Sequence, residues 1–371
     1  MFCALGFETQ RGRSLVDLMV GITIAMLVIF FAASIAVGHN SRATAMGSAS
    51  DATGQALFVY HSMAREIRQA GFGLAGTPPG CMADAWRENR QPGAFRMPMF
   101  PVYINPSWIA PGDPGTDVIY VLRGNGASQS SEVRFRTVSS SAASIKVSNR
   151  QGLLPGDVLV ALSPDGACKV VQATNLPASG ICDNAGGDPD VVIISSGSFR
   201  DPSSGCAQSR AIWNRPGNGI DFSSGTLFNI GRDPVAVAYA VRNSTLVVCD
   251  VAKSDCANPS RTKDPSVWSP IAFGIIALQA EYGRDDSSPP DGVVDRYDKT
   301  PPSAGCDVSR IVSVRFGLAA MSQTRETQPV ASSPPSWEGG AFDMTSVPDW
   351  RYRRFRVQSG VVNLRNASPS C

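Results

Sequence analysis

The segment that most constrains this chain is the apolar run from Leu15 to Val37, in which Asp17 is the one charged residue. A helix of this length spans roughly 35 Å, enough to cross a bilayer core of about 30 Å. Arg11 and Arg13 precede the run, and the positive-inside tendency places this end in the cytoplasm. The sequence therefore predicts a single-pass membrane helix, with the N-terminus in the cytoplasm and the rest of the chain outside.

Asp17 needs a partner, because a bare Asp in the hydrocarbon costs on the order of 2.5 to 3.5 kcal/mol, and less near the interface. A secretory signal would place its cleavage site after the apolar run, whereas here the small residue Gly12 lies before it. Cleavage after Gly12 would keep the helix in the mature chain and free the amine of Arg13, which could pair with Asp17 of a neighbouring copy. The alternative is a plain signal-anchor helix in which Gly12 and Asp17 occur by chance.

The order Gly12, Arg13, Ser14, Leu15, Val16, Asp17 resembles the class III leader of type IV prepilins. That leader has a Gly, an aromatic or similar residue, a Thr or Ser, two aliphatic residues and an acid at the fifth mature position. In the family, prepilin peptidase cuts after the Gly and methylates the new N-terminus, and the acid pairs with the amine of another subunit during assembly. The resemblance implies processing at Gly12 and Arg13 and an assembly contact at Asp17, although Arg13 replaces the usual aromatic and Asp17 the usual Glu.

A second part of the helix is expected beyond the apolar run. Apolar residues recur at three- and four-residue spacing at Ala56, Tyr60, Met63, Ile67 and Ala70, which predicts one face packed on a globular domain. Glycines and a Pro-Pro pair from residue 71 to residue 79 end the helix. The expected organisation is a leader at 1–12, a transmembrane or filament-core helix at 13–37, an amphipathic continuation at 38–76 and a periplasmic β-rich domain at 77–371.

The rest of the chain consists of short β-rich runs between turn residues. We expect strands at 118–122, 133–138, 144–147, 158–162, 169–173, 191–194, 235–241, 246–251, 271–282, 310–318 and 352–362, with a hairpin at 242–245. Segments 78–114, 182–187 and 329–348 are rich in Pro, Gly or Ser and are expected to be loops. The predicted fold class is α+β, with the long N-terminal helix packed on a mostly antiparallel sheet with long disulfide-bonded loops, and no linker divides it.

The cysteines indicate disulfides. Of nine, Cys3 lies in the leader, and the other eight would face an oxidising compartment: Cys81, Cys168, Cys182, Cys206, Cys249, Cys256, Cys306 and Cys371. Eight cysteines allow 105 pairings, so the connectivity stays open; Cys249 with Cys256 closes the shortest loop and is the first pair we expect. No C-x-x-C pair is present, which argues against structural zinc.

An enzymatic function is disfavoured by the two histidines, His39 and His61, which both lie on the N-terminal helix. The globular domain therefore lacks the histidine of a Ser-His-Asp or Cys-His triad, and we expect no catalytic residue. Two further features carry alternatives. Asp285, Asp286, Asp291 and Asp295 surround a turn and could bind Ca²⁺, although they match the calcium-loop pattern incompletely; the alternative is a solvated hairpin loop.

The second feature is the basic and aromatic segment 350–356. It could contact nucleic acid, but a strand would divide its arginines between two faces, and the net charge of +2 gives no electrostatic argument for nucleic acid. We expect a strand here, and neither nucleic acid nor a small-molecule substrate as a partner.

Four stretches resemble the PilW family of minor pilins: Met63–Phe72, Gly156–Val160, Leu278–Gly283 and Tyr352–Phe355 with Asn363–Asn366. This resemblance implies a low-abundance minor pilin that primes assembly of a type IV pilus near its tip. The implied partners are prepilin peptidase, other minor pilins, the major pilin, a large tip adhesin and the inner-membrane assembly platform, and the filament would become extracellular. Two alternatives remain: a type II secretion pseudopilin, which shares the leader and the long helix, and a membrane-anchored periplasmic enzyme.

Overall fold

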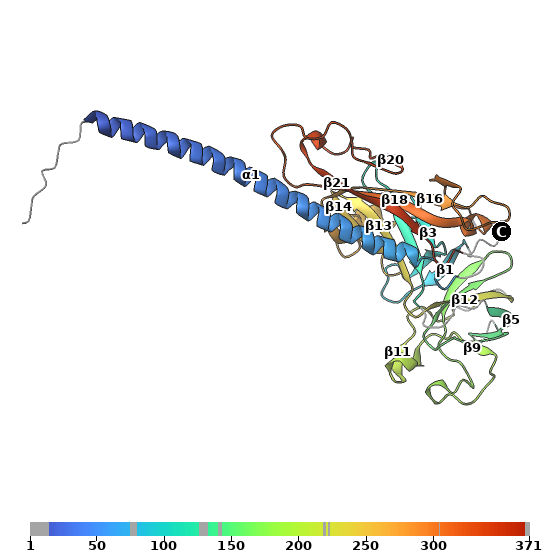
Figure 1. The fold of residues 1–371 in the computed structure, drawn as a ribbon. Helices are drawn as coiled ribbons and strands as arrows, with labels where there is room; N and C mark the ends of the chain where they lie inside the picture. The colour runs from blue at the N-terminus through green and yellow to red at the C-terminus, as the bar shows by residue number, and fades with distance from the viewer. Residues whose placement is uncertain are drawn as a thin grey trace, which may run out of the picture.

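The computed structural model describes residues 15–74, 80–125, 133–139, 143–217, 220–221, 223–303 and 305–367. Within these ranges it describes the backbone alone at 16–17, 32–53, 136–139 and 183. A helix, α1 (Leu15–Arg68), projects from a β-rich body (Figure 1). Short helical turns occur in that body at α2 (Cys306–Ser309), η1 (Ile181–Asp183), η2 (Pro202–Ser204), η3 (Pro259–Arg261) and η4 (Trp350–Tyr352).

Two antiparallel sheets flank the C-terminal part of α1. The first has the strand order β15 (Ser269–Phe273), β14 (Thr245–Asp250), β13 (Val235–Arg242), β4 (Ile119–Arg123) and β3 (Val102–Ile104). The second has the order β17 (Arg296–Asp298), β16 (Ile275–Arg284), β18 (Ile311–Met321) and β21 (Phe355–Asn363).

One face of α1 is buried between these sheets. Val59, Met63 and Ile67 lie at most 1% exposed and pack with alternate strand residues such as Leu278 and Phe316. The three- and four-residue spacing of apolar residues places them on one side of the helix, and the two-residue period of the strands supplies the opposing surface. This cluster is the core that holds the helix to the body.

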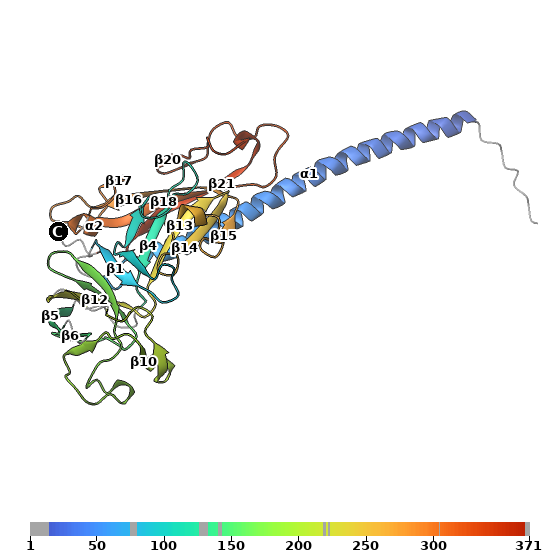
Figure 2. The same ribbon diagram turned by 180° about the vertical axis from the view of Figure 1, so that it is seen from behind.

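A third sheet forms a separate lobe, visible below the helix in Figures 1 and 2. Its strand order is β2 (Ala94–Pro98), β1 (Met82–Trp86), β8 (Cys168–Gln172), β7 (Val158–Leu162), β12 (Gly225–Gly231), β5 (Val133–Ser139), β6 (Ser144–Val147) and β9 (Val191–Ile193). The lobe joins the first sheet through a cluster of buried side chains that includes Val160, Phe228 and Ala238.

Six strands of this third sheet close on themselves. After β8, Thr174 N donates to Ile193 O at 2.7 Å, and Ile193 N donates to Asn175 O at 2.9 Å, so β9 is bonded back to the segment that continues β8. Strands β5 to β9 and β12 therefore surround one apolar cluster, which includes Leu159, Val171 and Val192. We call these six strands the barrel; closure leaves few strand edges open to other chains.

Two small hairpins lie on the surface: β10 (Ser198–Asp201) with β11 (Ala207–Arg210), and β19 (Ser336–Trp337) with β20 (Gly340–Ala341). The second covers the outer face of β16 and β18, where Phe342 is buried. The Cα of Gly317 lies under Trp337, since a Cβ added there would stand 2.9 Å from that ring.

The mostly β fold agrees with the expectation, but four predictions of element boundaries were wrong. One is the loop expected at 329–348, which contains β19 and β20. Residues 78–114, expected to be a loop, contain β1, β2 and β3, which are short because prolines interrupt them. The single strand expected at 271–282 is two strands, β15 and β16, because Gly274 has φ of 75° and breaks the run. The strand expected from Tyr352 begins at Phe355, after the η4 turn.

Disulfides connect Cys81 with Cys168, Cys182 with Cys206, and Cys249 with Cys256. The last pair is the one predicted from its short loop. Cys306 is also disulfide-bonded, and Cys371 lies outside the described residues. The bond Cys81–Cys168 ties the start of β1 to β8, and Cys182–Cys206 ties the η1 turn to the β10–β11 hairpin.

Candidate functional site

The first candidate surface is the contact between α1 and the two flanking sheets. Tyr60 stacks on Phe316 with ring centroids 4.8 Å apart. Glu66 forms an ion pair with Arg123 at the end of β4, and the second contact, Arg123 Nη2 to Glu66 Oε1, is 3.2 Å. Gln55 Oε1 accepts from Phe273 N of β15 at 2.9 Å. These polar contacts fix the angle at which the helix leaves the body.

The C-terminal segment closes over the end of α1. Asn366 Nδ2 donates to Gln69 O and to Ala70 O at 3.1 Å each, and Arg365 N donates to Arg68 O at 3.1 Å. Carbonyls in the last turn of a helix lack partners within the helix, so these donors cap it. Beyond the cap, Gly71 has φ of 78°, as expected for a glycine that ends a helix.

Apolar side chains of α1 outside this contact are exposed. One of them is Phe58, which is 69% exposed, and Ile271 and Phe273 of β15 are exposed as well. Further toward the N-terminus every described large apolar side chain is exposed: Leu15, Leu18, Met19, Val20, Ile22, Ile24, Met26, Leu27, Val28, Ile29, Phe30 and Phe31. The exposed apolar side chains along 15–31 form a surface typical of contact with another protein or with lipid.

The Asp-rich loop was the candidate metal site. Asp285 is fully buried and accepts from Gly292 N at 2.6 Å and from Ser287 N at 3.0 Å. Asp295 accepts from Asp286 N at 2.7 Å, and Asp286 forms an ion pair with Arg296. Burial alone would raise the pKa of Asp285, but the backbone donors outweigh it and its pKa lies below the ordinary value.

The four carboxylates therefore stabilise the turn itself; Asp291 accepts from Val293 N at 2.8 Å. Among the described residues no group of three or more His, Cys, Asp or Glu side chains is placed to hold a metal ion. Calcium binding at this loop stays a prediction.

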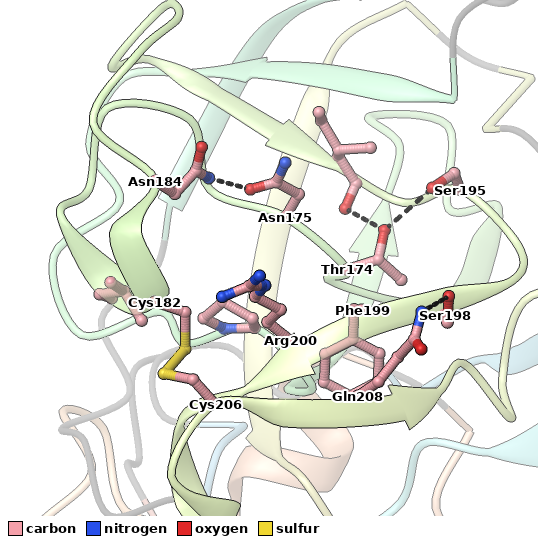
Figure 3. A pocket seen from close by; sticks show the side chains of 13 residues that line it. Thr174, Asn175, Cys182, Asn184, Ser195, Ser198, Phe199, Arg200, Cys206 and Gln208 are labelled. Carbon is pink, nitrogen blue, oxygen red and sulfur yellow. Dashed lines mark hydrogen bonds between the residues drawn. A yellow bond between two sulfur atoms is a disulfide. The ribbon is translucent and has the colours of Figure 1, made fainter.

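The second candidate surface is a cleft of about 880 Å³ beside the barrel (Figure 3). One wall is the junction of β8 and β9, with Thr174 and Ser195, and the opposite wall is the β10–β11 hairpin. The η1 turn forms the third side. The residues that line it are Pro155, Thr174, Asn175, Ile181, Cys182, Asn184, Ile193, Ser195, Ser198, Phe199, Arg200, Cys206 and Gln208.

The walls of the cleft are fixed to one another. The Cys182–Cys206 disulfide joins the η1 turn to the hairpin. Arg232 forms an ion pair with Asp201 of β10 and donates to Pro155 O at 2.6 Å, which ties the hairpin to the barrel. The ion pair, together with hydrogen bonds from Ser203, outweighs burial and lowers the pKa of Asp201 to about 2.

The contact between α1 and the two flanking sheets is formed largely by a segment that is similar to a known protein family. Residues 238–366 match the family model described as type IV pilus-assembly protein W. This segment matches the PilW family. It runs from within β13 to just past β21 and so contains most of the strands that pack on α1, together with the residues that cap it.

A type IV-like pilin from Thermus thermophilus is similar over 58% of this chain and 87% of its own, with 12% identity and a TM-score of 0.21, which carries no argument. No curated protein is significantly similar to the chain.

The PilW segment confirms the family resemblance and associates the chain with the type IV pilus. Of the stretches that carried the resemblance, Leu278–Gly283, Tyr352–Phe355 and Asn363–Asn366 lie inside the segment, whereas Met63–Phe72 and Gly156–Val160 lie outside it. The barrel and the cleft precede the PilW segment in the chain. The family is one of pilus-assembly proteins and not a known class of enzyme.

The predicted processing and assembly residues cannot be placed. Gly12 and Arg13 lie outside the described residues, and Asp17 lies in α1 where side chains are not described. Within the described residues no helix is long and apolar enough to cross a membrane. Of the histidines, His61 is exposed on α1, and the side chain of His39 is not described.

The basic C-terminal segment is engaged within the protein. Arg353 donates to Ser322 O at 3.2 Å, and Arg354 pairs with Glu326 at 2.8 Å. The arginines thus hold the loop after β18.

Two features of these surfaces could not be predicted from the sequence. Glu66 and Arg123 are distant in the sequence, and nothing in it indicates that they pair. The polar residues that line the cleft are mostly hydroxyl and amide side chains, a composition also typical of solvated loops.

Proposed function

We propose that the chain is a minor pilin of a type IV pilus, incorporated at low abundance near the tip, where it helps other minor pilins to prime assembly. The observation that carries the proposal is the PilW segment, which forms most of the surface that holds α1. The exposed apolar side chains of α1 and β15 support it, because such a surface suits packing against other subunits.

In this proposal prepilin peptidase cuts after Gly12 and methylates Arg13. The apolar part of α1 is stored in the inner membrane and then enters the filament core, where Asp17 pairs with the N-terminal amine of a neighbour. The proposed partners are other minor pilins, the major pilin, a large tip adhesin and the inner-membrane assembly platform. The chain acts by binding and not by catalysis.

Deletion of the gene in its native host tests this function. We expect loss of surface pili and of twitching, restored by the full-length gene supplied in trans. Loss of protein secretion with intact pili would instead show a type II pseudopilin. A deletion strain without either defect would contradict both, and would favour a membrane-anchored enzyme.

A further inference from the structure

We propose that the cleft between the barrel and the β10–β11 hairpin binds a saccharide. Its volume of about 880 Å³ falls in the range of ligand sites, roughly 300 to 1,000 Å³, so it is large enough for a small ligand. The cleft lies in a part of the chain that precedes the PilW segment, so membership of that family does not account for it.

The cleft is formed before any ligand binds. Its three sides are joined by the Cys182–Cys206 disulfide and by Arg232, which contacts both Asp201 and Pro155 O. Thr174 Oγ1 lies 3.2 Å from Ser195 Oγ and donates to Ile193 O at 3.1 Å, which fixes the barrel wall. A preformed site binds without the cost of ordering loops.

The backbone groups of the strands around the cleft are already hydrogen-bonded. A peptide that adds a strand needs a row of unpaired N–H and C=O groups at a sheet edge. Here Ile193 N and O are bonded to residues 174 and 175, β10 is paired with β11, and Ala211 N donates to Gly197 O at 2.7 Å. The cleft therefore offers a ligand mainly side chains, which disfavours an extended peptide.

Three amide side chains in the cleft keep atoms that are free to bond a ligand. Asn184 Nδ2 bonds Asn175 Oδ1 and donates to Leu176 O, and one amide atom of Gln208 bonds Ser198 Oγ at 2.8 Å (Figure 3). The other amide atoms of Asn175, Asn184 and Gln208 have no partner among the described residues. They comprise donors and acceptors, and they accompany hydroxyl groups that can act as either.

That mixture matches the hydroxyl groups of a sugar, each of which donates and accepts. The residues that line the cleft include no carboxylate, histidine or lysine, so strongly charged metal or amine ligands lack a counter-charge. Arg200 also lines the cleft. Phe199, with Ile181 and Ile193, gives an apolar floor for the C–H face of a ring.

The test is saturation-transfer NMR on the full-length chain in a detergent without a sugar headgroup. The probes are methyl glycosides of glucose, galactose, mannose and N-acetylglucosamine, then lactose, N,N′-diacetylchitobiose and glucuronic acid. We expect transfer to at least one probe. Gln208→Ala should raise the Kd for that probe about three- to tenfold, the effect of one neutral hydrogen bond.

Two further variants make the result specific. Ser198→Trp, at an exposed position on β10, should fill the cleft and abolish the transfer, and Gln323→Ala, an exposed glutamine outside the cleft, should leave it unchanged. Circular dichroism of each variant checks its fold. Absence of transfer to every probe overturns the proposal, as does equal binding by Ser198→Trp. Binding of a random heptapeptide pool without any saccharide also overturns it, and assigns the cleft to peptides.

Discussion

Arg123, at the end of β4, and Glu66, on α1, form a two-point ion pair that joins the helix to the globular body. Both side chains are about one-fifth exposed, so water screens the pair only partly. The pair lies in the last turn of α1, just before the carbonyls of Gln69 and Ala70 that Asn366 caps. It is therefore placed to hold the helix in one orientation on the body.

Replacing Glu66 tests how much this contact contributes. Glu66→Gln should lower the free energy of unfolding by about 1.5 kcal/mol, at the lower end for hydrogen bonds to charged groups. Guanidinium denaturation of the detergent-solubilised chain measures it. The matched control is Glu338→Gln, at an exposed glutamate without a hydrogen-bond partner among the described residues, which should change stability little. Equal effects of the two variants would show that the pair does not hold the helix.

Gly124 lies where three segments meet. A Cβ added there would stand 2.6 Å from Ile230 O and 2.8 Å from Phe72 O, both of them backbone atoms that cannot turn aside. Gly124→Ala should therefore destabilise the chain by about 1 to 3 kcal/mol, the cost of overpacking a filled site. Gly186→Ala is the control, because nothing lies within 4 Å of its added Cβ. Thermal unfolding of both variants checks this, and a wild-type melting temperature for Gly124→Ala would contradict the close packing.

The Asp201–Arg232 pair predicts an acid-sensitive hairpin. The pKa of Asp201 is about 2 in the folded chain, below its ordinary value of 3.8, so the ionised form is stabilised by folding. Its contribution is complete above about pH 4 and is lost as the pH falls through 2. Asp201→Asn should be less stable than wild type at pH 7, and the difference should shrink between pH 4 and pH 2.

Guanidinium denaturation at pH 7, 4 and 2 measures that difference. Asp233→Asn, at an exposed aspartate next to Arg232 in the chain, is the control for removing a carboxylate at this place. A difference for Asp201→Asn that stayed constant from pH 7 to pH 2 would mean that the carboxylate does not act through its charge.

Asp17 carries the proposed assembly contact. Asp17→Ala should leave membrane insertion intact, since it removes a charge from an apolar helix, and should lower incorporation into pili. Immunoblots of membrane and sheared-pilus fractions measure the two quantities separately. Thr23→Ala, a neutral change further along the apolar run and outside the leader motif, is the matched control. Normal incorporation of Asp17→Ala would show that the acid is dispensable.

Local patterns in the sequence predicted much of the β structure. Strands at 144–147 and 158–162 occur with the expected bounds, and the turn at 242–245 joins β13 to β14 as expected, with Asn243 and Ser244 both at positive φ. The Cys249–Cys256 disulfide was predictable because its loop is short. In each of these cases residues near one another in the sequence determine the structure.

Long-range pairing accounts for what was missed. The barrel closes through contacts between residues 174–175 and 193, and no local pattern indicates which edges will meet. Strands β1 to β3 are only three to five residues long, and prolines surround them. The cleft depends on this closure and on the Cys182–Cys206 bond, one of many pairings that the sequence left open.

The most direct test of the pilin account is the N-terminus of the mature protein, measured by mass spectrometry on chain purified from its native host. The account predicts cleavage after Gly12 and an N-methylated Arg13 as the first residue. An intact Met1, or cleavage after Val37 that removes the apolar part of α1, would contradict it.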